Sequence, residues 1–111
     1  MAFTPYHNIL GATARDNELV AISDISRKAI QAIQITNIDA SAAATVGLYL
    51  YKDSTDTTAE QTIYILHDVV VPYATSLLLD DPNILRFDNN NYSLHIEVGA
   101  SDKIDVIIRA K

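Results

Sequence analysis

The sequence is poor in the residues that mark many functional classes. Its 111 residues include no cysteine, no tryptophan, three glycines and three prolines. Without cysteine, the chain can form no disulfide framework, thiolate zinc site or cysteine nucleophile. The glycines Gly11, Gly47 and Gly99 lie too far apart to build a glycine-rich phosphate loop. No G-x-S-x-G motif, which would indicate a serine nucleophile, occurs either.

Basic residues and long apolar runs are also scarce. The chain has eight Lys and Arg residues and fourteen Asp and Glu residues, so its net charge is −6. This acidic charge argues against a nucleic-acid partner. The longest purely apolar runs are short, as at residues 69–71 and 77–79, whereas spanning a bilayer takes about 20 residues. The first six residues lack the basic and apolar regions of a secretory signal. We therefore expect no membrane partner and synthesis in a cytoplasm.

Apolar and polar residues alternate in several stretches, which is the pattern of a half-buried β-strand. Residues 92–98 and 103–109 show it most clearly, and they predict a C-terminal hairpin joined by residues 99–102. Residues 45–51 and 61–66 predict two further strands. The side chains predicted to face the core are Val46, Leu48, Leu50, Ile63, Ile65, Tyr92, Leu94, Ile96, Val98, Ile104, Val106 and Ile108.

Shorter strands are predicted at residues 69–71, 77–79 and 84–87. The first ends at Pro72, because proline cannot donate to a β-ladder. Residues 23–35 are ambiguous: Ser26 could begin a helix, but the capping box is incomplete, so a strand from about residue 29 to 36 is favoured.

About eight short strands with frequent turns are typical of β-sandwiches and barrels. We expect an all-β fold, an antiparallel β-sandwich of jelly-roll or immunoglobulin-like type. Residues 1–17 would form an N-terminal arm or a first irregular strand. Residues 18–111 would form a single β-sandwich domain.

The titratable residues do not form a recognisable catalytic pattern. His7, His67 and His95 are widely spaced, and the neighbours His67 and Asp68 would point to opposite faces of a strand. The acidic groups at residues 53–56 and 80–88 lack a calcium-loop pattern and are explained by turn formation. We therefore predict no catalytic, cofactor-binding or metal-binding residues, and no enzyme activity.

Outward-facing apolar side chains are the feature that stands out. If the even-numbered residues of 46–50 fill the core, Tyr49 and Tyr51 face away from it, and Tyr64 and Leu66 do the same on the next strand. Several such side chains together suggest a contact patch, because aromatic residues are favoured at interface cores. The predicted partner interface consists of Tyr49, Tyr51, Tyr64, Leu66, Ile107, Phe3 and Tyr6.

The order of motifs along the chain resembles that of a known protein family. Residues 6–12 lead into a short strand at 19–22, a second strand ends at Thr36 and Asn37, and a loop of small residues at 39–44 feeds the strand at 45–50. A tyrosine-rich strand, the step from Val71 to Pro72, a leucine-rich strand and a closing hairpin follow. In this arrangement the whole chain resembles the small β-sandwich virion structural proteins of tailed bacteriophages.

The resemblance implies no catalytic residues and no cofactor, and it implies assembly on a capsid, neck or tail. We expect a virion component made in the host cytoplasm, foremost a capsid decoration (cement) protein. Its partners would be the major capsid protein or other virion proteins, and it would form homo-oligomers on the particle. The alternatives are a neck, tail or fibre-associated adaptor, or a carbohydrate-binding β-sandwich module that uses Tyr49, Tyr51 and Tyr64 as its platform.

Overall fold

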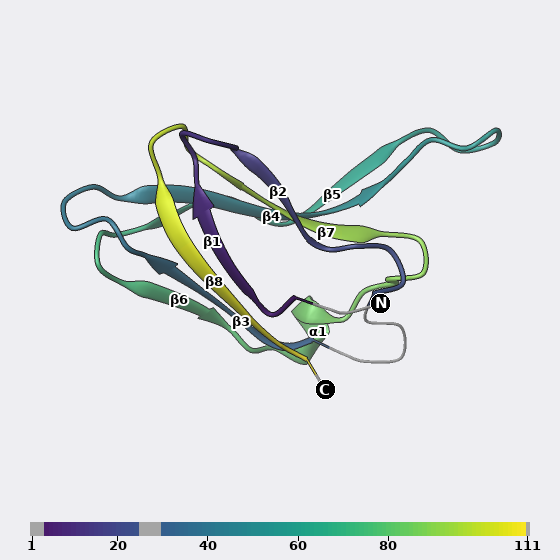
Figure 1. Cartoon of the computed structure of the whole chain (residues 1–111). Helices are drawn as coiled ribbons and strands as arrows, with labels where there is room; N and C mark the ends of the chain where they lie inside the picture. Colours follow the sequence, from purple (N-terminus) through teal and green to yellow (C-terminus); the bar gives the residue numbers. More distant parts are fainter. Residues whose placement is uncertain (1–3, 25–29, 111) are drawn as a thin grey trace.

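The chain folds into two four-stranded antiparallel sheets that pack face to face (Figure 1). The computed structural model describes residues 4–24 and 30–110. One sheet, sheet A, has the strand order β1 (Tyr6–Leu10), β8 (Lys103–Ala110), β3 (Ile30–Asn37) and β6 (Ser76–Leu79). The other, sheet B, has the order β2 (Asp16–Val20), β7 (Ser93–Val98), β4 (Ala44–Lys52) and β5 (Gln61–Val71). The predicted all-β sandwich is confirmed.

The core lies between the two sheets and is filled by aliphatic side chains. Strict alternation places Leu48 of β4 and Leu94 and Ile96 of β7 there, opposite Ile104 and Val106 of β8, as predicted. Fully burying each such side chain contributes about 1.5–3 kcal/mol, so the burial of these side chains is a large favourable term in folding. The largest fully buried apolar side chains are Ile33, Ile35, Leu48, Leu85, Leu94, Ile96, Ile104, Ile108, Val20, Val46 and Val106.

The predicted C-terminal hairpin is wrong. Strand β7 pairs with β2 and β4, whereas β8 pairs with β1 and β3, so residues 99–102 carry the chain from one sheet to the other. Both strands have an apolar face, and this crossover lays those faces against each other across the core. The Asp102 carboxylate stabilises it by accepting hydrogen bonds from the backbone N–H groups of Gly99 (2.7 Å) and Thr45 (3.0 Å).

The predicted strand at residues 84–87 is also wrong, because a single helical turn, α1 (Pro82–Leu85), occupies this segment. Asp81 caps it by accepting a hydrogen bond from the N–H of Asn83 at 2.9 Å, and Pro82 occupies the first turn, where a missing N–H costs nothing. The turn buries Leu85 in the core. No helix in the described ranges is long and apolar enough to cross a membrane.

The ambiguous segment is a strand from Ile30 onward, as favoured, whereas Ser26 and its possible helix start lie outside the described residues. At the N-terminal end, residues 6–10 form an edge strand of sheet A and residues 16–20 an edge strand of sheet B. The segment predicted as a strand at residues 19–22 thus begins earlier and ends at Val20.

Strand β5 is one irregular strand of 11 residues rather than the two predicted. Its register with β4 shifts twice, so that Tyr49 lies opposite Tyr64, Leu48 opposite Leu66 and Val46 opposite Val69. Each shift adds one residue to β5, which is a β-bulge. The prediction that Leu66 faces outward is therefore wrong: Leu66 lies opposite the buried Leu48 and packs against the core.

Candidate functional site

A row of aromatic rings crosses the outer face of sheet B. The Tyr49 ring stacks on His95 with centroids 5.1 Å apart and 13° between the ring planes. On one side Tyr51 meets His95 edge-on at 5.7 Å; on the other Tyr64 lies 5.5 Å from Tyr49 and 4.5 Å from His67. Because β7, β4 and β5 are neighbours, the row joins three strands on the face turned away from the core.

Carboxylates surround this row and hold its phenols protonated. Burial, and then the hydrogen bond to Asp16, raise the pKa of Tyr49 far above its usual value. The pKa of Tyr51 is raised chiefly by its hydrogen bond to Glu60 (2.6 Å), and that of Tyr64 chiefly by its hydrogen bond to Glu97. These phenols can therefore donate hydrogen bonds but are poor bases and nucleophiles near neutral pH.

The predicted interface residues separate into two groups. Tyr49, Tyr51 and Tyr64 share the outer face of sheet B, but Tyr49 is only 9% exposed because neighbouring rings cover it, whereas Tyr64 is 43% exposed. Tyr6 and Ile107 lie opposite each other on β1 and β8 of sheet A, across the sandwich. Leu66 packs against the core, and Phe3 lies outside the described residues. The structure thus brings three of the seven together on one face.

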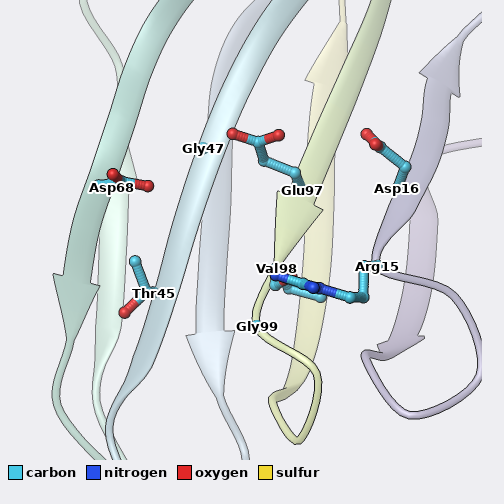
Figure 2. Close-up of a pocket in the computed structure, with 8 residues that line it drawn as sticks. All are labelled: Arg15, Asp16, Thr45, Gly47, Asp68, Glu97, Val98 and Gly99. Atoms are coloured by element: carbon cyan, nitrogen blue, oxygen red, sulfur yellow. The ribbon is translucent and has the colours of Figure 1, made fainter.

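A hollow of about 410 Å³ lies on the same face of sheet B (Figure 2). Its floor includes Gly47 of β4, and three carboxylates, those of Asp16, Asp68 and Glu97, line it. Arg15 also lines the hollow, where its Nε donates a 3.4 Å hydrogen bond to the carbonyl of Val98. The hollow combines an acidic lining with one guanidinium, which suits a small cationic or polyhydroxylated ligand. Its full lining is Arg15, Asp16, Thr45, Gly47, Asp68, Glu97, Val98 and Gly99.

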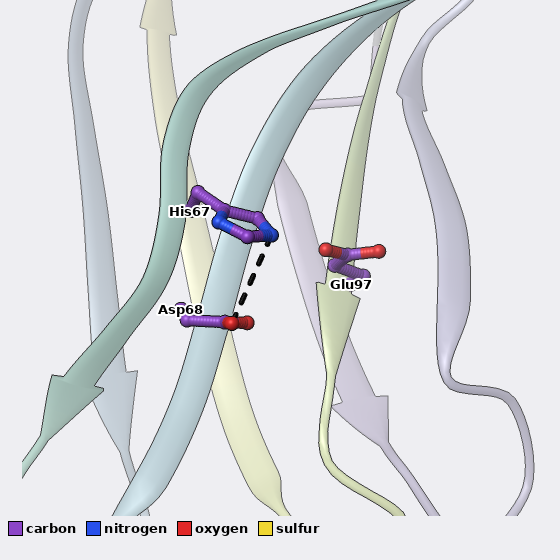
Figure 3. Close-up of side chains that lie close together, drawn as sticks. All are labelled: His67, Asp68 and Glu97. Atoms are coloured by element: carbon purple, nitrogen blue, oxygen red, sulfur yellow. Dashed lines mark ion pairs between the residues drawn. The ribbon is translucent and has the colours of Figure 1, made fainter.

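At the edge of this hollow, His67, Asp68 and Glu97 form a cluster that sequence reasoning missed (Figure 3). The expectation that His67 and Asp68 point to opposite faces is wrong: His67 Nε2 lies 3.8 Å from Asp68 Oδ2. Regular alternation fails here because the chain bulges and Asp68 has a left-handed backbone (φ 53°). The available signal was Gly47, since glycine inside a strand often marks a bulge or a close approach.

Comparison with known proteins found no match: no family model matches the chain, and neither a curated protein nor a solved structure shows significant similarity to it.

Proposed function

We propose that this chain is a non-enzymatic virion structural protein of a tailed bacteriophage, and specifically a decoration protein that binds and stabilises the outer capsid. The observation that carries the proposal is the long edge strand β5, whose hairpin with β4 projects beyond the body of the sandwich (Figure 1). The motif order of the sequence supports the same class. The partner would be the major capsid protein or another virion protein.

Strand β5 differs from the other sheet edges in length. It has 11 residues, whereas the edge strands β1, β2 and β6 have 5, 5 and 4. An exposed edge offers unpaired N–H and C=O groups to a neighbouring chain, and bulges or short length normally prevent such pairing. The bulges of β5 begin only after Tyr64, so its first four residues remain a regular edge.

Exposed apolar side chains lie along the same strand. Ile63 is 47% exposed and Val70 is 60% exposed, near opposite ends of β5. The sequence predicts Ile63 in the core, but its side chain is about half exposed near the start of β5, where Ile63 pairs with Leu50 of β4. Backbone pairing combined with a few apolar anchors is a common way for one chain to add to the sheet of another.

The net charge of −6 supports a position on the solvent side of a shell, because packaged DNA would repel an acidic chain. Each contact would be small, and many copies on a lattice would bind by multivalency.

The test is analysis of particles purified from the phage that carries the gene. Mass spectrometry should find the chain in the particle, and cryo-electron microscopy should place hundreds of copies on the capsid surface. Around a dozen copies at the neck or tail would instead identify the adaptor alternative. Absence of the chain from purified virions would refute the whole proposal.

The role of β5 can be tested separately with a matched pair of variants. Ile63→Asp should abolish binding to particles that lack the chain, whereas Ile84→Asp, at a side chain of similar exposure (45%) on α1, should leave binding unchanged. If Ile63→Asp bound the particles as tightly as Ile84→Asp and the wild type do, the β5 edge would be excluded as the contact.

The second candidate is a carbohydrate-binding module, which the aromatic row beside the acidic hollow favours. Tyr64, not the covered Tyr49, would be the stacking residue. Glycan-array binding that Tyr64→Ala abolishes and Ile63→Asp leaves intact would support this candidate over capsid binding.

A further inference from the structure

Three potential metal ligands from two strands converge on the outer face of sheet B (Figure 3). One imidazole nitrogen of His67 and one carboxylate oxygen each of Asp68 and Glu97 all lie within 4.8 Å of one another. His67 and Asp68 belong to the edge strand β5, and Glu97 belongs to β7. Strand β4 runs between them, so the cluster bridges over a whole strand.

Two features of the fold produce this convergence. The bulge in β5, with Asp68 at φ 53°, turns two successive side chains to the same face. On the intervening strand β4 the residue facing Glu97 is Gly47. A Cβ atom there would lie 3.0 Å from Glu97 Oε1 and 3.1 Å from Glu97 Cγ, tighter than ordinary van der Waals contact, so the glycine gives the Glu97 side chain room to lie across β4 (Figure 2).

The donor set indicates which ion would fit. One imidazole and two carboxylates match Zn²⁺ and related divalent transition-metal ions, whereas Ca²⁺ and Mg²⁺ prefer oxygen ligands alone. The two carboxylates would neutralise a divalent charge. Ligands of tetrahedral Zn²⁺ lie about 3.4 Å apart, as follows from bond lengths near 2.1 Å. The 3.8 Å between His67 and Asp68 is close to this spacing.

We propose that His67, Asp68 and Glu97 bind a divalent transition-metal ion of the zinc class, with water completing its coordination in the adjoining hollow. The side chains of His67 and Asp68 are 61% and 70% exposed, so they can rotate to close the remaining distance. The bound ion would tie the edge strand β5 to β7 over Gly47. This proposal does not depend on the function proposed above.

The test is calorimetric titration of the full chain, freed of metal by chelation, with Zn²⁺ alone and with Ca²⁺ alone. We expect one Zn²⁺ per chain and at least tenfold weaker Ca²⁺ binding. His67→Gln and Glu97→Gln should each weaken Zn²⁺ binding at least tenfold.

The matched control is Glu18→Gln. Glu18 also lies 3.8 Å from a histidine, His95, on the same face of sheet B. Like Glu97→Gln, the substitution removes one negative charge and keeps the shape of the side chain. It should change the Zn²⁺ affinity less than twofold. The proposal is overturned if the wild type does not bind Zn²⁺, if Glu97→Gln binds like the wild type, or if Glu18→Gln loses as much affinity as Glu97→Gln. Equal affinity for Ca²⁺ would overturn the assignment to the zinc class.

Gly47→Ala tests the geometry rather than the ligands. The added methyl group would displace the flexible end of Glu97 while all three ligands remain in the sequence. Zn²⁺ affinity should fall at least tenfold. Wild-type affinity in a folded Gly47→Ala protein would overturn the bridging arrangement, and if this variant did not fold, the Glu97→Gln and Glu18→Gln pair would still decide the proposal.

Discussion

The Tyr49 hydroxyl donates a hydrogen bond to the Asp16 carboxylate, and this bond joins β4 to the edge strand β2 over the intervening strand β7. His95 of β7 stacks on the same tyrosine ring, so three strands of sheet B are linked on their outer face. A residue that the sequence marks as an outward contact thus also holds its own sheet together.

Tyr49→Phe should therefore destabilise the fold. It removes a hydrogen bond to a charged group at a mostly covered site, and we expect a loss of about 1–2 kcal/mol in the free energy of unfolding. Urea denaturation of the wild type and the variant measures this difference in the free energy of unfolding. Tyr51→Phe is the control, since its bond to Glu60 is exposed to solvent and its loss should change stability little. Equal stability of Tyr49→Phe and wild type would show that the Asp16 bond is not stabilising.

Alkaline pH should destabilise the protein. The pKa values of Tyr49, Tyr51 and Tyr64 are raised in the folded state, whereas unfolded tyrosine titrates near pH 10. Below pH 10 both states keep these protons and the stabilisation is fully present. Above it the unfolded state loses them first, so stability falls as pH rises. Absorbance titration of the folded wild type and of Tyr49→Phe checks this, because the difference between the two curves reports the ionisation of Tyr49. A midpoint of that difference at or below pH 10 would contradict the prediction.

Gly11→Ala should be severely destabilising. A Cβ atom at Gly11 would lie 1.8 Å from the backbone oxygen of Gly99, in the turn that carries the chain between the sheets. Backbone must move to relieve that overlap, so we expect a loss of about 3 kcal/mol or more. Gly47→Ala is the contrast, because a Cβ atom there would lie 3.0 Å from the movable Glu97 side chain and no closer than 3.2 Å to backbone, at the Leu66 carbonyl oxygen. Thermal unfolding of both variants measures the difference, and similar melting temperatures would refute the close approach.

Asn37→Asp should also be costly. The buried Asn37 amide donates hydrogen bonds to the carbonyls of Ala42 (2.9 Å) and Val71 (3.0 Å), which a carboxylate would repel. We expect a loss of about 3 kcal/mol in chemical denaturation at pH 7. The loss should shrink at low pH, where the new carboxyl is protonated. The exposed substitution Asn83→Asp should stay within about 0.5 kcal/mol of wild type, and an equally small effect at Asn37 would contradict the network.

Much of the fold follows from local alternation. The apolar residues 46, 48, 94, 96, 104 and 106 repeat with period two, and that spacing places them on one face of a strand wherever the strand lies. Their burial could be predicted for this reason. The single turn at Pro82 could not be separated from a strand, because four residues contain too little periodicity to distinguish the two.

The candidate site was less accessible to sequence reasoning. Tyr49, Tyr51 and Tyr64 were correctly placed on an outer face, because their orientation follows from the alternation of β4 and the regular first part of β5. His67 and Asp68 were not, because a bulge arises from the pairing of two strands and leaves no local periodic signal.

The sequence by itself determined that this protein is built from short strands with one apolar face each, that it is acidic, and that cysteine chemistry is excluded. Only the tertiary structure decided which strands share a sheet. It placed β7 and β8 in opposite sheets, turned Leu66 inward and brought His67, Asp68 and Glu97 together over Gly47. The physical reason is that alternation is a property of neighbouring residues. Sheet partners and bulges, in contrast, depend on hydrogen bonds and packing between segments far apart in the chain.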